Sequence, residues 1–176
     1  MEKIVQNGAA ILRDVAVPVP EELFGTSKLT AILTKMEKAL DPEMEGVALA
    51  APQIAIPYRI FLVRMDRTMP PPPMEEHATR VAPVAQNVFY INPKILKTSR
   101  KTTPMDEGCL SVRGVYGTTN RHERVTISAR TPDGASIERG AGGLLAQIFE
   151  HEIDHLNGIL FIDQATHLIE IKHDHE

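Results

Sequence analysis

LLAQIFEHEIDHLNG, residues 144–158, has the apolar spacing of an amphipathic helix, and Gly158 stands where a C′ glycine ends such a helix. Side chains at i, i+4, i+7 and i+11 share one helix face. In this stretch they are Leu144, Ile148, His151 and His155. The aliphatic first half of the stripe predicts that it points inward, with Glu150 and Asp154 on the outer face.

Two histidines at this spacing aim their imidazoles at one point, where they can ligate a single divalent cation. Glu152, directly after His151, is close enough to act on a water bound to that cation. The alternative is a charged, solvated helix face. A catalytic metal site also needs a third protein ligand, either downstream of Gly158, as in a zinc protease, or Cys109 in DEGCLSVRG.

The composition is that of one soluble globular domain, with 176 residues, 43% hydrophobic and 24% charged. A net charge of −4 gives no sign of a nucleic-acid or membrane surface. No apolar run approaches the roughly 20 residues of a membrane span, and the N-terminus lacks the pattern of a signal peptide. We therefore expect a cytoplasmic protein. The single cysteine excludes an intrachain disulfide.

The remaining patterns predict one further helix and several strands. Residues 27–40 carry an apolar helical stripe, with Thr26 or Ser27 as N-cap. Residues 58–65 and 88–91 are predicted to be buried strands, and residues 124–139 a hairpin that turns at TPDG. Between the first two strands, residues 66–87 form a long loop with four consecutive prolines.

Strands dominate the first two-thirds of the chain and one strong helix comes near its end, which is typical of an α+β fold. We expect one compact domain over residues 1–165. In it, antiparallel or mixed sheets pack around the central helix that carries the two histidines. Residues 166–176 are predicted to be a short polar tail.

Three segments occur in order: GVALAAPQ at 46–53, EGCLS at 107–111 and HEIDH at 151–155. Together they resemble the signature segments of the peptide deformylases, and the resemblance covers about residues 3–163. It implies an enzyme that removes the N-formyl group from the starting methionine of new polypeptides. Its partners would be formyl-methionyl nascent peptides, with transient proximity to the ribosome and no direct contact with nucleic acid or membrane.

The resemblance also implies a set of metal ligands, namely Cys109, His151 and His155, with a water in the fourth position. Ferrous iron is the expected native metal, with nickel or cobalt as working substitutes and zinc as a poorer one. Glu152 is implied to be the general base and then the general acid. The backbone N–H of Leu110 and the side-chain amide of Gln53 are implied to stabilise the tetrahedral oxyanion.

The same resemblance assigns substrate-binding and supporting residues. The substrate-binding set is Val47, Ala48, Gly108, Leu144 and Ile148, of which Val47, Leu144 and Ile148 form an apolar pocket for the methionine side chain. Glu107 and Arg121 are implied to form an ion pair that supports Cys109.

Two positions depart from the family pattern. Ala48 replaces the second glycine of the first segment, which is harmless only if its φ angle is ordinary. Gln147 stands where an aliphatic residue is commoner, which predicts a wetter or shallower pocket.

Two other functions fit parts of these observations. One is a zinc endopeptidase that uses the same helix with a downstream third ligand. The other is a metal- or peptide-binding protein that keeps the fold and lacks turnover.

Overall fold

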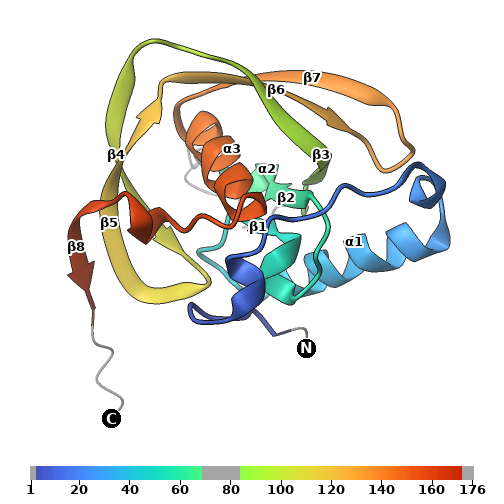
Figure 1. The fold of residues 1–176 in the computed structure, drawn as a ribbon, viewed down its shortest axis with the longest axis horizontal. Helices are drawn as coiled ribbons and strands as arrows, with labels where there is room; N and C mark the ends of the chain where they lie inside the picture. Colours follow the sequence, from blue (N-terminus) through green and yellow to red (C-terminus); the bar gives the residue numbers. More distant parts are fainter. Residues whose placement is uncertain (1–2, 69–83, 172–176) are drawn as a thin grey trace, which may run out of the picture.

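The computed structural model describes residues 3–68 and 84–171 (Figure 1). Its helices and strands are, in chain order, η1 (Ala10–Leu12), η2 (Glu21–Leu23), α1 (Ser27–Leu40), β1 (Ala48–Ala50), η3 (Ala51–Ile54), β2 (Ile60–Arg64), α2 (Met65–Thr68), β3 (Asn87–Thr98), β4 (Thr102–Cys109), β5 (Val112–His122), β6 (Arg124–Arg130), β7 (Ser136–Gly142), α3 (Gly143–Leu156), η4 (Phe161–Asp163) and β8 (Thr166–Glu170).

These strands form two antiparallel sheets, one of five strands in the order β1-β2-β3-β6-β7 and one of three in the order β4-β5-β8. Helix α3 lies at the centre, with the three-stranded sheet on one side and the long strands of the other sheet curving over it (Figure 1). The predicted α+β fold, with antiparallel sheets around the helix that bears both histidines, is confirmed.

Strand β2 is buried along its whole length because helices cover both faces of the sheet at this point. Successive residues of a strand point to opposite faces. Ile60 and Leu62 pack in the core cluster built around α1, while Phe61 and Val63 pack in the cluster built around α3. This is why β2 has no polar–apolar alternation in the sequence.

Helix α3 is anchored to the five-stranded sheet by aromatic side chains. The ring centroid of Phe149 lies 5.0 Å from that of Tyr90, in an edge-on contact, and 5.9 Å from that of Phe61. The rings of Phe61 and Tyr90 stack on each other with their centroids 4.9 Å apart. Each such pair typically adds about 0.5–1.5 kcal/mol beyond the burial of its apolar area. The contacts fix α3 against β2 and β3.

The predicted helix over residues 27–40 is α1, and Thr26 is its N-cap, with the Thr26 Oγ1 accepting a hydrogen bond from the Leu29 N–H at 3.3 Å. The predicted hairpin is β6–β7, with residues 131–135 in its turn. The predicted strand at 88–91 continues to Thr98 as β3.

The prediction that Glu150 lies on an outer face of the helix is wrong. Glu150 is 8% exposed, and its carboxylate accepts the backbone N–H of His122 at 2.8 Å and meets the His122 Nδ1 at 2.6 Å. The three-stranded sheet covers the side of α3 that was expected to face solvent. Conversely, Leu144 at the start of the helix is 43% exposed.

Regular structure continues past residue 165, where the sequence analysis ended the domain. Strand β8 pairs with β5, with Ile169 opposite Tyr116 and Thr166 opposite Thr118. Residues 166–170 therefore form an edge strand of the three-stranded sheet. Of the predicted proline-rich loop, residues 69–83 lie outside the described residues, as do residues 172–176 of the predicted tail.

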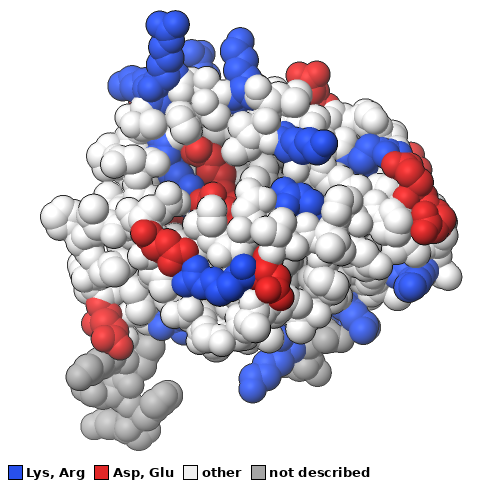
Figure 2. All heavy atoms as spheres, in the orientation of Figure 1, with Lys and Arg blue, Asp and Glu red and all other residues white. Residues whose placement is uncertain are grey.

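Acidic and basic side chains are both spread over the face of the molecule drawn in Figure 2. Within residues 3–68 and 84–171, no helix has the length and apolar character that crossing a membrane would take.

Gly158 ends α3 with a φ of +74°, and a Cβ there would clash with the backbone carbonyl of Arg13. We expect Gly158→Ala to lower the free energy of unfolding by about 2–5 kcal/mol, because strain from a left-handed residue adds to overpacking. The matched control is Gly25→Ala, with a φ of +71° and no atom within 4 Å. It should cost only about 1–2 kcal/mol. Denaturant unfolding measures both, and equal losses would contradict the role of the Arg13 contact.

Candidate active site

Three of the predicted residues bring their ligand atoms together between β4 and α3. Cys109 ends β4, while His151 and His155 lie one turn apart on α3, and one ligand atom from each lies within 4.8 Å of the other two. The Cys109 Sγ is 3.2 Å from the His155 Nε2. A thiolate with two imidazoles is a donor set that suits zinc and iron alike. The residues present therefore fit a divalent metal ion.

The orientation of His151 is set by Glu107. The His151 Nδ1 lies 2.6 Å from the Glu107 Oε1, which leaves the Nε2 of the ring for the cluster. Hydrogen bonding of this kind fixes the ring and tautomer of a metal-binding histidine. Glu107 in turn receives hydrogen bonds from the Arg121 Nη2 at 2.8 Å, the Arg121 Nε at 3.1 Å and the Thr119 hydroxyl.

Glu107 and Arg121 are both almost completely buried, at 5% and 4% exposure. Burial raises the pKa of the Glu107 carboxyl, but hydrogen bonds with His151 and Arg121 outweigh it, so this pKa lies below its usual value. The Arg121 Nη1 also donates to Asp154 on α3 at 2.7 Å. The predicted ion pair thus exists and links β4, β5 and α3.

The thiol of Cys109 lies in a turn that supplies hydrogen-bond donors. The pairing of β4 with β5 shifts register between Gly108 and Cys109, and the Ser111 N–H points at the Cys109 Sγ at 3.4 Å. Gly108 lies opposite Tyr116, whose ring is so close that a Cβ at Gly108 would lie 2.8 Å from it. A side chain at position 108 would therefore fit only if the ring of Tyr116 moved.

Gln53 is held in one orientation beside the thiol. Its Oε1 accepts the Ala50 N–H at 2.8 Å, and its Nε2 donates to the Ser111 Oγ at 3.1 Å and points at the Cys109 Sγ at 3.6 Å. Only 2% of its surface is exposed. Leu110 follows Cys109 in the same turn, and its carbonyl accepts a hydrogen bond from Gln6.

Glu152 is buried at the cavity with one oxygen unsatisfied. The residue is 4% exposed, and its Oε2 has no hydrogen-bond partner among the described residues. Burial raises the pKa of Glu152 to about 7, with the positive charge of His151 opposing that effect. A carboxyl group with this pKa can take up or release a proton near neutral pH.

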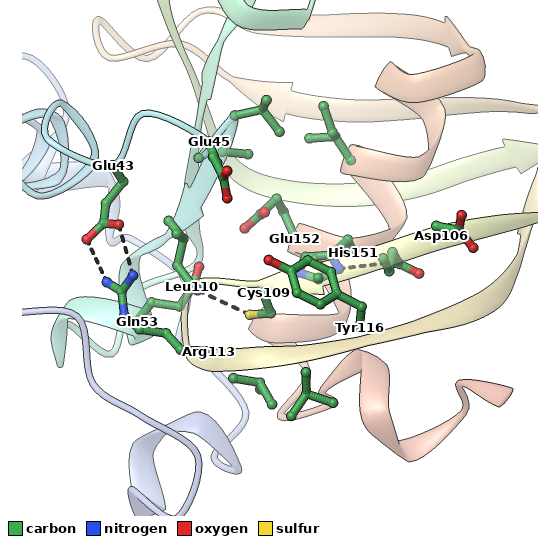
Figure 3. A pocket seen from close by; sticks show the side chains of 18 of the residues that line it. Glu43, Glu45, Gln53, Asp106, Cys109, Leu110, Arg113, Tyr116, His151 and Glu152 are labelled. Atoms are coloured by element: carbon green, nitrogen blue, oxygen red, sulfur yellow. Dashed lines mark hydrogen bonds and ion pairs between the residues drawn. The ribbon is translucent and has the colours of Figure 1, made fainter. Parts of the chain in front are cut away.

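A cavity of about 660 Å³ opens over these groups. Figure 3 shows Cys109, His151, Glu152 and Tyr116 at its centre and the Glu43–Arg113 ion pair toward one end. All of the predicted substrate-binding residues line it, namely Val47, Ala48, Gly108, Leu144 and Ile148. Ala48 is not among the residues with positive φ and pairs with Val63 in β1–β2, so its conformation is ordinary for an alanine.

Sequence reasoning missed Ser111 and Thr119, both of which are buried and bonded to site residues. Thr119 is two positions before Arg121 on β5, so both side chains leave the same face of the strand toward Glu107. The i, i+2 spacing of a hydroxyl and a guanidinium was the signal available. Ser111 carried no signal beyond its place in EGCLS.

Asp163 is one of the acidic residues downstream of Gly158 that could supply a third ligand, and its carboxylate pairs instead with Arg13 at 2.5 and 3.1 Å. In residues 3–68 and 84–171, the Cys109–His151–His155 cluster is the group of His, Cys and acidic side chains close enough to hold a metal ion.

Comparison with known proteins agrees with this geometry. The family model for polypeptide deformylase matches residues 1–170. A peptide deformylase of Halothermothrix orenii is 37% identical over 167 residues, covering 94% of both chains, and one of Hydrogenovibrio crunogenus is 36% identical over 157 residues, covering 89% of this chain and 81% of that one.

Solved structures are similar as well. A Met-Ala-Ser-bound peptide deformylase of Acinetobacter baumannii superposes with a TM-score of 0.78 at 34% identity, covering 92% of this chain and 97% of that one. The Thermotoga maritima peptide deformylase gives 0.78 at 30% identity, covering 94% and 98%. The chain therefore belongs to the peptide deformylase family of metal-dependent hydrolases, which remove N-formyl groups from new polypeptides.

Proposed function

We propose that this deformylase acts at the Cys109–His151–His155 cluster, holds one divalent metal there with Fe²⁺ as its native ion, and binds formyl-methionyl peptides in the adjoining cavity. The observation that carries the proposal is the convergence of a thiol and two imidazoles beside the unpartnered, buried oxygen of Glu152. We place the activity in the cytoplasm, on nascent peptides near the ribosome.

When bound, such a cation acts as a Lewis acid and lowers the pKa of a coordinated water toward about 7. Cys109, His151 and His155 would hold it, and the carboxylate of Glu107 would keep the ring of His151 in the binding orientation. Nickel, cobalt and zinc can occupy the same donor set, because nitrogen and sulfur donors bind all of these divalent first-row metals.

Glu152 moves the proton in this mechanism. Its carboxylate would take a proton from the attacking water and later deliver it to the departing amine, a general base that becomes a general acid. Both roles suit a carboxyl with a pKa of about 7, since it is partly ionised at neutral pH.

Gln53 and Leu110 would stabilise the oxyanion that develops on the formyl oxygen. The Gln53 amide is already aimed, since its oxygen is fixed by Ala50 and its Nε2 faces the cluster. A fixed donor needs no reorganisation during the reaction, and one such donor is typically worth about 3–4 kcal/mol. The Leu110 N–H, one residue after Cys109, would provide the second donor.

The peptide substrate would lie between two strands. Strand β1 ends the five-stranded sheet and β4 ends the three-stranded sheet, and Ala48 of β1 and Gly108 of β4 both line the cavity. Edge strands offer backbone groups to which an extended peptide can add as a further strand. The methionine side chain would then reach Val47, Leu144 and Ile148, a contact worth about 2–3 kcal/mol.

The first test is hydrolysis of a formyl-Met peptide by iron-loaded protein under anaerobic conditions, with the acetyl-Met peptide as control. We expect formate from the formyl peptide alone and no product from the control. Metal content is assayed in parallel. A fully loaded protein that binds the formyl peptide without releasing formate would instead be a non-catalytic binding protein.

Glu152→Gln removes the proton-transfer group while keeping its size. We expect metal content equal to that of the parent and a loss of at least about 100-fold in kcat, since general acid–base catalysis contributes about 10²–10⁴-fold. Single-turnover kinetics with the loaded variant measures it. A variant that stays within about tenfold of the parent would show that Glu152 does not carry the proton.

Cys109→Ala separates the deformylase site from a zinc-endopeptidase site with a downstream ligand. With only two histidines left, we expect the purified variant to hold well under one equivalent of metal. Elemental analysis after dialysis measures this, with Glu152→Gln as the folded, metal-retaining control. Full occupancy in Cys109→Ala would exclude Cys109 as the third ligand.

A further inference from the structure

Gln147 is a buried polar residue in an apolar part of the cavity wall. It lies on α3 one turn before His151 and next to Ile148, and it lines the cavity together with Val47 and Leu144. Only 6% of its surface is exposed. A side chain bound against Val47, Leu144 and Ile148 would therefore also meet Gln147.

The orientation of the Gln147 amide follows from its one hydrogen bond. The Nε2 donates to the backbone carbonyl of Asp106 on β4 at 2.8 Å. The flipped amide would set two carbonyl oxygens against each other, so the nitrogen belongs on the Asp106 side. Among the described residues nothing donates to the Oε1 of Gln147. This oxygen is an acceptor without a donor, on a residue that lines the cavity.

We propose that Gln147 determines specificity for the first residue of the substrate. Its Oε1 accepts a hydrogen bond from the tip of the first side chain. Besides formyl-Met peptides, the enzyme thus takes formyl peptides whose first side chain has the length of methionine and ends in an O–H or N–H donor. The inference rests on the proposed function, since it needs the first side chain to lie against Val47, Leu144 and Ile148.

The physical reason is the cost of burying a donor. A hydroxyl that leaves water for a purely apolar pocket loses its hydrogen bonds, and such a pocket disfavours it by roughly 10- to 100-fold against a methyl of the same size. An acceptor at the right place restores one bond and removes most of that difference. Methionine itself gains nothing from the acceptor, because its thioether has no donor.

The test compares two formyl tripeptides that differ in one terminal group. The first residue of formyl-X-Ala-Ser is norleucine, which ends in a methyl, or 5-hydroxynorvaline, which has the same length and ends in a hydroxyl. For the iron-loaded parent we expect kcat/KM values within about fivefold of each other, because the hydroxyl keeps a partner. A larger preference for norleucine in the parent overturns the proposal without any variant.

Gln147→Met and Gln147→Leu remove the acceptor and keep a side chain of similar volume. We expect the norleucine preference to rise by about tenfold or more in both, carried mainly by KM of the hydroxyl peptide. Activity on the norleucine peptide reports whether each variant folds and catalyses the reaction. If Gln147 had a merely structural role, the substitution would lower kcat/KM for both peptides together and leave the ratio of the two values unchanged. A ratio within about twofold of the parent in an active variant overturns the proposal.

The proposed function and the inference about Gln147 are tested by different measurements. Hydrolysis of formyl-Met-Ala-Ser by the parent tests the proposed function, and the ratio between the two analogues tests Gln147. If the parent hydrolyses formyl-Met-Ala-Ser but prefers the norleucine peptide by more than about fivefold, the inference about Gln147 is rejected and the proposed function stands. Absence of turnover on all three formyl peptides rejects both.

Discussion

The buried carboxylate of Glu107 is the constraint on which the rest of the site depends. It stands on β4, receives Arg121 and Thr119 from β5, and contacts His151 on α3. Removing one partner from a buried ion pair leaves an uncompensated charge and typically costs 3–5 kcal/mol. The network therefore fixes the distance between β4, which carries Cys109, and α3, which carries the two histidines. Arg121 strengthens the link because it also reaches Asp154, one turn further along α3.

The same arrangement explains why polar groups can be buried around α3 at all. Aromatic contacts from Phe149 fix one face of the helix to the five-stranded sheet, and the three-stranded sheet covers the opposite side. Nearly every buried polar group on the helix has a partner, as Glu150 has in His122. The Oε2 of Glu152 is an exception, as is the Nδ1 of His155. Unsatisfied buried groups are costly, and one of these two belongs to Glu152, a residue that lines the cavity.

The sequence predicted the elements whose apolar residues follow one clear period. Helices α1 and α3 and the β6–β7 hairpin have such periods, and β2 was recognisable as a continuous apolar run. Strand β4, with the sequence TTPMDEGC, could not be predicted, because its side chains face the candidate site or solvent and form no apolar pattern. Glu150 was misplaced for a related reason, since a helical period does not reveal that a second sheet covers the polar side. The ligand set came from resemblance to a family, because Cys109 and His155 are 46 residues apart and meet only through the fold.

The two departures from the family pattern, Ala48 and Gln147, differ in how much of the surrounding structure is needed to interpret them. The question at Ala48 concerned one backbone angle, and its place in β1, paired with Val63, answers it: the φ is ordinary and the methyl packs in the core around α3. The question at Gln147 concerned the polarity of a cavity wall, which depends on where both ends of an amide point. Its nitrogen is used by the Asp106 carbonyl, 41 residues away in the chain. Because that partner comes from β4, the same strand that holds Glu107 and Cys109, the contacts that position the Cys109–His151–His155 cluster also position the amide of Gln147. A change in the β4–α3 distance would therefore alter both the proposed metal site and the proposed first-residue preference.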